Sequence, residues 1–143
     1  MRFFQLFLVV GVLFLSGCSL LKPETVDSSL TLENCYFKLV TIGSEKVQVY
    51  DNQGEPHLIL GNKGNVYGSD GCNRLMGSYK IDKDKVEFSQ MASTMMACQD
   101  GMDQAAKFMQ NLNKVERYSI SGENLSFSNR DGEVILSFKA VVF

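Results

Sequence analysis

Short runs of alternating apolar and polar residues, separated by turns rich in Gly, Asn and Asp, fill most of residues 35–143 and constrain the fold more than any other feature. A period of two predicts strands that bury one face, and Gly, Asn and Asp are preferred in tight turns. Strands joined by such short turns pair with their sequence neighbours as an antiparallel meander. We expect strands at 35–42, 46–50, 57–61, 66–71, 78–81, 85–91, 117–120, 124–128 and 133–143.

In one segment, residues 101–115, the apolar residues recur with the period of a helix instead of that of a strand. Met102, Ala105, Met109 and Leu112 recur at the spacing of a single helix face. We interpret this Met-rich stripe as a core face, the alternative being that it lines a ligand groove. Strands around a single helix predict an α+β domain, in which a curved antiparallel sheet or incomplete β-barrel of about seven to nine short strands accompanies one amphipathic helix.

The N-terminal segment indicates export and lipidation. Residues 1–17 combine an early Arg, an apolar run and small residues before Cys18, which is the pattern of a secretory signal peptide. The apolar run is shorter than the roughly 20 residues that a membrane span needs. LSGC, ending at Cys18, resembles the bacterial lipobox, and this resemblance implies diacylglyceryl transfer to the Cys18 thiol, cleavage before Cys18 and acylation of its amine. We therefore predict a signal peptide at 1–17, a lipidated flexible tether at 18–32 and a folded domain at 33–143.

The residue after the lipidated cysteine bears on the choice of membrane. An Asp at this position would resemble the inner-membrane retention signal of many Gram-negative lipoproteins, whereas this chain has Ser19. Two or more acyl chains, such as a diacylglycerol and a palmitate, give stable anchoring. We therefore expect a protein held by lipid in the outer membrane and facing the periplasm.

The charges of the chain argue against a nucleic-acid partner. The full sequence holds 14 Lys and Arg against 16 Asp and Glu, and removal of the signal peptide takes away only Arg2, leaving 14 − 1 = 13 against 16. A domain that binds nucleic acid usually carries a basic stripe. This chain has none, so we expect no nucleic-acid partner.

No set of residues has the spacing of a catalytic, metal or cofactor site. A cysteine nucleophile needs a base within hydrogen-bond reach, and His57 is the single histidine. A structural zinc site uses four nitrogen or sulfur ligands, usually in two close pairs, whereas His57 and the cysteines are widely separated along the chain. Neither a GxSxG elbow nor a phosphate-binding GxxxxGK[ST] pattern occurs. We expect no enzymatic activity, no metal and no cofactor.

Two motif stretches carry a family resemblance. GSDGCNRLMGSY at 68–79 has the form GxxGCNxxxGxY, and STMMAC at 93–98 is close to STxMAC and leads into the predicted helix. Together they resemble the META domain, or HslJ-like, family. The matching positions are Gly68, Gly71, Cys72, Asn73, Gly77, Tyr79, Ser93, Thr94, Met96, Ala97 and Cys98. The resemblance implies a small antiparallel β-structure with one helix, a role in envelope or stress tolerance, and no established catalytic activity.

The chemistry of these motif residues favours structural roles. Glycines on either side of Cys72 and Asn73 allow bent or left-handed backbone that a Cβ would oppose. The Asn73 side chain can bond neighbouring backbone groups and hold a turn, and Ser93 and Thr94 can satisfy free backbone donors before the helix. The alternative is a functional polar pocket formed by Asn73, Arg74, Ser93 and Thr94.

Three cysteines remain after Cys18, and in an oxidising compartment we expect one pair and one odd thiol. We favour a disulfide between Cys72 and Cys98 because each lies in one of the two motif stretches. Cys35 is then a buried strand thiol. The alternatives are that Cys35 is bridged in place of a motif cysteine, or that Cys72 and Cys98 lie adjacent but reduced.

Two functional hypotheses follow. In the first, the chain is a non-catalytic envelope lipoprotein that supports envelope integrity or stress tolerance by contacting another envelope protein. In the second, it is a carrier or pilot-like chaperone that takes a lipid or an apolar peptide into its interior or a groove. A carrier needs an apolar cavity, whereas an interaction domain is filled to ordinary interior density.

Overall fold

Nine strands and one helix make up the domain in the computed structural model, which describes residues 30–141. Residues 1–29, and with them the predicted signal peptide and Cys18, lie outside the described residues. The elements are β1 (Tyr36–Ile42), β2 (Glu45–Lys46), β3 (His57–Leu60), β4 (Asn65–Ser69), β5 (Arg74–Asp82), β6 (Lys85–Ser93), α1 (Met102–Leu112), β7 (Arg117–Ser121), β8 (Asn124–Ser128) and β9 (Val134–Val141).

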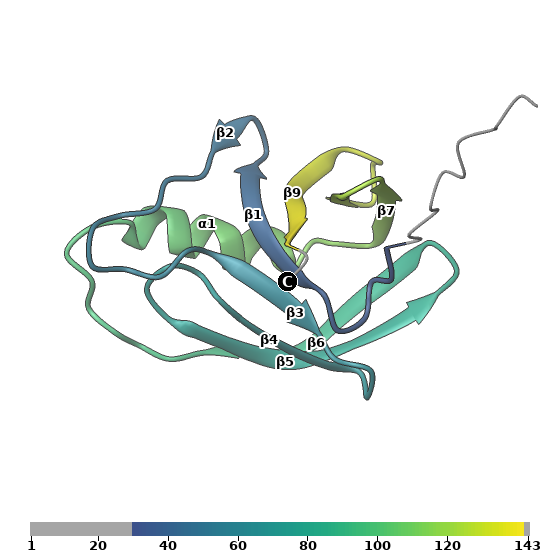
Figure 1. Cartoon of the computed structure of the whole chain (residues 1–143), viewed down its shortest axis with the longest axis horizontal. Helices are drawn as coiled ribbons and strands as arrows, with labels where there is room; N and C mark the ends of the chain where they lie inside the picture. Colours follow the sequence, from purple (N-terminus) through teal and green to yellow (C-terminus); the bar gives the residue numbers. More distant parts are fainter. Residues whose placement is uncertain (1–29, 142–143) are drawn as a thin grey trace, which may run out of the picture.

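All nine strands belong to one antiparallel sheet that curves back on itself (Figure 1). Its order is β2-β1-β3-β4-β5-β6-β7-β8-β9, and β9 also pairs with β1 along most of its length. The sheet is ring-like but is not a barrel, because β6 and β7 share a single residue pair, Lys85 with Arg117. The predicted curved antiparallel sheet with one helix is confirmed.

The segment 46–50 departs from the prediction, since only its first residue, Lys46, belongs to a strand. Val49 is 52% exposed, and its alternation with Val47 does not build a sheet face. The reason is that β1 already pairs with β3 and β9 beyond its short hairpin with β2, so no partner edge is available. The chain instead runs past the helix, where Gln48 bonds to Gln104.

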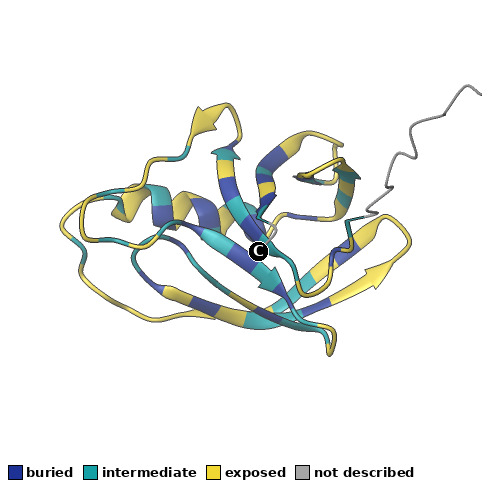
Figure 2. Cartoon of the chain, viewed as in Figure 1, coloured by how far each residue is buried: buried dark blue, intermediate teal, exposed yellow. Residues whose placement is uncertain are grey.

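Large apolar side chains fill the interior of the ring. Figure 2 marks the buried residues in dark blue along the strands and the helix. Phe127 lies edge-on to both Phe88 and Phe138, with ring centroids 5.4 Å apart in each pair, and Phe108 of α1 packs on Phe138. Phe108, Phe127 and Phe138 are at most 1% exposed. Burial of aromatic rings on this scale supplies much of the folding free energy of a small domain.

Helix α1 turns only part of its predicted Met-rich stripe toward this core. Its buried residues are Ala105, Phe108 and Leu112, and they face β1 and β9. Met102 is 45% exposed, so its interpretation as a core residue is wrong, and Met109 is only partly buried. The face of α1 that packs on the core is centred on Phe108 and not on the methionines of the predicted stripe.

The described chain enters the domain at one end and gathers its long loops at the other (Figure 1). Leu32, predicted to lie in the tether, is buried, and Glu33 forms an isolated parallel bridge with Leu60. The opposite end carries the loops between β2 and β3, between β4 and β5, and between β6 and α1. Within residues 30–141, the single helix is too short and too polar to cross a bilayer.

Candidate functional site

The two motif stretches meet at the loop end of the domain. A disulfide joins Cys72, in the turn after β4, to Cys98, in the loop before α1, with their Cα atoms 6.0 Å apart. This is the pairing favoured from the sequence. Cys35 is the free cysteine of the described chain and is partly buried; burial raises the pKa of its thiol, which disfavours the nucleophilic thiolate.

Asp70 holds the turn that carries Cys72. Its Oδ1 accepts hydrogen bonds from the backbone amides of Cys72 at 2.9 Å and Asn73 at 2.5 Å, and its Oδ2 accepts one from Asn73 Nδ2. The side chain is 4% exposed, and such dense bonding is what allows a carboxylate to be buried. Sequence reasoning missed Asp70, although an Asp that precedes Gly-Cys-Asn is a signal for a side-chain-stabilised turn.

Asn73 connects this turn to the second motif stretch. Its Oδ1 accepts hydrogen bonds from the backbone amide of Met96 at 2.7 Å and from Thr94 Oγ1 at 3.4 Å. Thr94 Oγ1 in turn accepts from the amide of Arg74, and the amide of Thr94 donates to the carbonyl of Arg74. The polar groups of Asn73 and Thr94 therefore bind one another and the backbone, while the Arg74 and Ser93 side chains are exposed. Asn73, Ser93 and Thr94 line one side of a groove described below, whereas Arg74 does not line it.

The remaining motif residues support the same turn and its flanking strands. Gly71 has a φ of 101°, a left-handed conformation that side chains oppose. A Cβ at Gly68 on β4 would strike the carbonyl of His57, and one at Gly77 on β5 would strike the Met91 side chain. Tyr79 is 5% exposed and donates its hydroxyl proton to the carbonyl of Gly61 at 2.8 Å.

A groove of about 500 Å³ opens beside this linked turn, between residues 93–97 and one side of α1. We call it the Met groove, because Met95, Met96, Met102 and Met109 line it, together with alanines and a few polar side chains. Met95 is 99% exposed and Met96 is 57% exposed. A somewhat larger hollow of about 560 Å³ lies near the β5–β6 turn, but it is lined mainly by charged side chains and is less suited to an apolar ligand.

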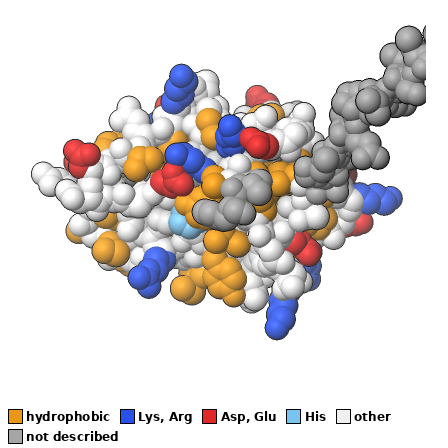
Figure 3. All heavy atoms as spheres, viewed as in Figure 1, with side chains coloured by type: hydrophobic (Ala, Val, Ile, Leu, Met, Phe, Trp, Pro, Cys, Tyr) orange, Lys and Arg blue, Asp and Glu red, His pale blue; other side chains and the backbone are white. Residues whose placement is uncertain are grey.

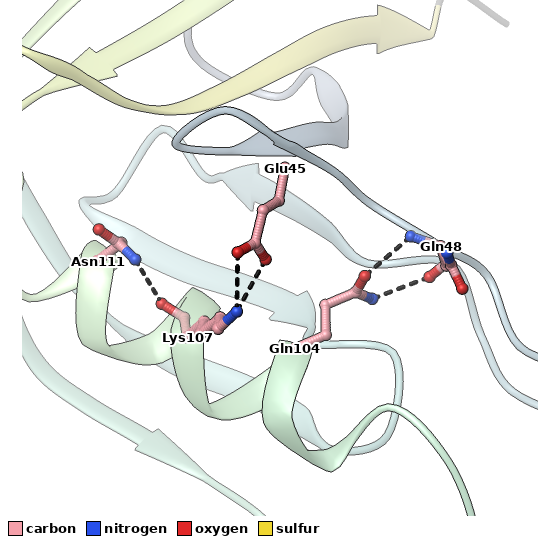
Figure 4. Close-up of polar contacts among 5 residues, drawn as sticks. All are labelled: Glu45, Gln48, Gln104, Lys107 and Asn111. Atoms are coloured by element: carbon pink, nitrogen blue, oxygen red, sulfur yellow. Dashed lines mark hydrogen bonds and ion pairs between the residues drawn. The ribbon is translucent and has the colours of Figure 1, made fainter.

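Polar contacts hold α1 on the side away from the Met groove (Figure 4). Gln104 exchanges two hydrogen bonds of 2.8 Å with the backbone of Gln48, and Lys107 forms an ion pair with Glu45. Glu45 raises the pKa of Lys107 by hydrogen bonding to its ammonium group. These contacts and the apolar face of α1 fix the helix to the sheet, so its Met102 and Met109 side chains stay at the groove.

A second cluster surrounds the single histidine and offers no nucleophile. His57 stacks on Tyr36 with ring centroids 4.4 Å apart, and its Nδ1 lies 2.9 Å from the carbonyl of Glu55. Glu55 accepts a hydrogen bond from the Tyr36 hydroxyl and forms an ion pair with Lys38. Burial of Tyr36, and to a smaller extent its hydrogen bond to the Glu55 carboxylate, raise the pKa of Tyr36 to about 12. Lys38 lowers the pKa of the Glu55 carboxyl. The cysteines of the motif stretches are bonded to each other and present no thiol to this histidine.

Ionic side chains of both signs are interspersed over the face seen in Figure 3. Among residues 30–141, no group of three or more His, Cys, Asp or Glu side chains is placed to hold a metal ion.

These features define a small α+β domain with a ring-like antiparallel sheet and a disulfide-linked pair of loops. Residues 30–142 match the META domain family, and the chain belongs to that family. A search of curated proteins finds no match.

Solved structures share this fold at low sequence identity. A protein from Burkholderia xenovorans solved by NMR is 22% identical, with a TM-score of 0.65 over 78% of this chain and 85% of that one. A second protein solved by NMR is 20% identical, with a TM-score of 0.61 over 77% and 94% of the two chains. A DUF4847 family protein from Bacteroides vulgatus, known from a crystal structure, is 14% identical, with a TM-score of 0.53 over 76% and 93%. At these identities the likeness concerns the fold alone.

Proposed function

We propose that this META domain protein is a non-catalytic, lipid-anchored binding domain that holds an apolar segment of another envelope protein in the Met groove. The observation that carries the proposal is the concentration of exposed methionines along one groove, with Met95 almost fully exposed. Methionine side chains are flexible and polarisable, so a surface made from them adapts to apolar partners of varied shape. Contiguous exposed apolar surface is a common mark of an interaction site.

A binding role fits the chemistry of the motif residues better than catalysis does. The side-chain polar atoms of Asp70 and Asn73 hydrogen-bond to each other and to backbone amides, and Cys72 and Cys98 form a disulfide. A catalytic carboxylate or thiol needs a free reactive atom within reach of a substrate. These four residues therefore shape the turn beside the groove and have no free reactive atom for catalysis.

The filled interior favours a surface site over an internal cavity. Large side chains such as Phe37, Phe108 and Leu125 are fully buried within the ring. An apolar ligand inside the ring would have to displace this packing, at a cost of several kcal/mol for the lost contacts. We therefore place the ligand of the carrier hypothesis in the Met groove.

The anchor and the groove fit a role in the periplasm. In this proposal Cys18 carries the lipid in the outer membrane, and residues 19–29 join it to the domain, a span of at most about 40 Å when extended. The described chain enters at the end opposite the loops that form the groove (Figure 1). This arrangement favours a protein partner in the periplasm over the bilayer itself. The role in envelope integrity or stress tolerance, which the family resemblance implies, is part of the same proposal.

The test uses the full chain, exported in a Gram-negative host and transferred from membranes into nanodiscs. Random decapeptides displayed on mRNA are the probe. We expect selection of peptides rich in large apolar residues, with affinity reduced by about tenfold or more in the Met95→Asp/Met102→Asp variant. The control is Met76→Asp/Val134→Asp, which adds the same two charges at half-exposed positions outside the groove.

Three results would contradict the proposal. The first is a selection that enriches no peptide. The second is equal binding of the selected peptides by the groove variant and by its control. The third is a lipid that copurifies with the wild-type chain in native mass spectrometry and is lost only from the groove variant, because the occupant is then an acyl chain.

A further inference from the structure

Strand β6 has an edge with almost no strand partner, and this edge ends at Ser93, which lies at the Met groove with α1. From Glu87 to Ser93, β6 pairs with β5 on one side, with a bulge at Gln90 and Met91 where the register shifts. Its only pair with β7 is made by Lys85. Val86 is the last residue to bond across that side, donating its amide proton to the carbonyl of Glu116 just after α1. The rest of this edge is left without a strand partner among residues 30–141.

The last residue of this edge, Ser93, has backbone groups that point away from β5. The amide of Thr94 donates toward β5, to the carbonyl of Arg74. Because successive backbone groups of a strand point in opposite directions, the amide of Ser93 points away from β5. Ser93 also lines the Met groove. At Ser93, one wall of the groove therefore offers an outward backbone amide and carbonyl, and the other wall is the Met- and Ala-lined side of α1.

We propose, building on the function proposed above, that the occupant of the Met groove is an extended peptide that adds to the edge of β6 as a new strand. Its backbone bonds to β6, and its alternate side chains lie against Met102, Ala106 and Met109 of α1. Addition of a strand to an open sheet edge is a recurring mode of peptide recognition, in which main-chain bonds supply affinity and pockets for alternate side chains supply specificity.

The lining of the groove determines the chemistry of this peptide. Asp70 is the only charged residue in it, and its oxygens accept bonds from the turn. A charged side chain would lose its hydration there and find no opposite charge, so the segment facing α1 is uncharged and apolar. The 11 residues of α1 span about 16 Å, which matches about five residues of an extended strand.

The test is an N-methyl scan of the tightest decapeptide from the display selection, bound to the full chain in nanodiscs. N-methylation removes one amide donor and leaves the side chains unchanged. In an added strand only alternate amides face β6, so we expect affinity losses of about tenfold at alternate positions and little change between them. Loss without this period, as for a helical peptide, would overturn the strand inference while the proposed binding function stands.

A pair of variants tests the same edge from the side of the protein. Ser93→Pro removes the outward amide donor, whereas Ser93→Ala keeps it and removes only the hydroxyl. We expect Ser93→Pro to weaken peptide binding by about tenfold, and Ser93→Ala, which keeps the amide donor, to weaken it far less. If a folded Ser93→Pro protein, checked by circular dichroism, binds equally well, the inference is wrong. A failure of every peptide to bind the wild-type chain would overturn both this inference and the proposed function.

Discussion

Two apolar regions of this domain, the core of the ring and the Met groove, are built from similar residue types but differ in what covers them. In the core, Phe108, Phe127 and Phe138 lie at most 1% exposed and pack on one another. In the groove, Met95 and Met96 remain open to solvent. Apolar surface that no other residue among 30–141 covers adds little to the stability of the fold, and such surface commonly marks an interaction site.

Helix α1 contributes one face to the core of the ring and another face to the Met groove. Phe108 and Leu112 close the ring, whereas Met102 and Met109 face the groove. The disulfide and Asn73 then fix residues 93–98 as the opposite wall. The comparison predicts that substitutions in the core lower stability, that those in the turn do so less, and that those in the groove change binding alone.

Phe108→Ala is expected to have the largest effect. It removes a fully buried ring from the centre of the core, which lowers the free energy of unfolding by about 3–5 kcal/mol. Urea denaturation followed by circular dichroism measures the loss. Met102→Ala, on the exposed side of the same helix, serves as the control and should change stability by less than about 0.5 kcal/mol. Equal losses in the two variants would abolish the distinction between the faces.

Removal of the disulfide comes next. Cys72 and Cys98 are 26 residues apart, and releasing a loop of this length lowers stability by about 3.5 kcal/mol in the chain-entropy account. The Cys72→Ser/Cys98→Ser variant tests this by urea denaturation. Cys35→Ser, which leaves the disulfide in place, is the comparison. A double variant as stable as the wild type would show that the hydrogen bonds of Asn73 suffice to join the two stretches.

Asn73→Ala should have an intermediate effect, because it leaves the amide of Met96 and the carboxylate of Asp70 each short of a partner. Loss of a buried hydrogen-bonding group costs about 1–3 kcal/mol. Thermal unfolding of this variant beside Ser93→Ala, an exposed neighbour, measures the difference. If Asn73→Ala has the same melting temperature as the wild type, the buried side-chain amide of Asn73 is not what joins the two motif stretches.

The ion pair between Glu55 and Lys38, neither of which lines the Met groove, provides the smallest expected effect. Lys38 hydrogen-bonds to Glu55 and lowers the pKa of its carboxyl below the ordinary value of 4.5. A lowered folded-state pKa stabilises the fold above the unfolded-state pKa, and this contribution is lost as pH falls through the folded-state pKa.

Both partners are part-exposed, at 45% and 30%, so screening limits the contribution to less than about 1 kcal/mol. The stability difference between the wild type and Glu55→Gln should therefore be present at pH 7 and shrink below about pH 4. Unfolding curves across this range measure it. A difference that grew on acidification would have the wrong sign.

Local signals in the sequence explain which of these features were predictable. Alternation and turn residues located most of the strands, and the pairing of Cys72 with Cys98 followed from the two motif stretches. Residues 46–50 alternate as a strand does, yet they lack a free edge to pair with. Whether an alternating segment joins a sheet depends on its partners, which local pattern does not specify.

The Met groove was harder to predict for the same reason. The helical spacing of Met102 and Met109 indicates a face, but does not say whether that face meets the core or solvent. The outcome depends on Phe108 filling the ring and on the single pair between β6 and β7, which are long-range features. Asp70 was missed although its local signal was present in the sequence.

Hydrogen exchange at β6 tests the account most directly. The full chain in nanodiscs is labelled with deuterium in the absence and presence of the selected decapeptide, and uptake by residues 87–93 is measured by mass spectrometry. We predict that the peptide slows exchange in this segment, because its backbone bonds the outward amides of β6, and that β9, already paired on both sides, changes little. Saturating peptide that leaves exchange of residues 87–93 unchanged would contradict the account.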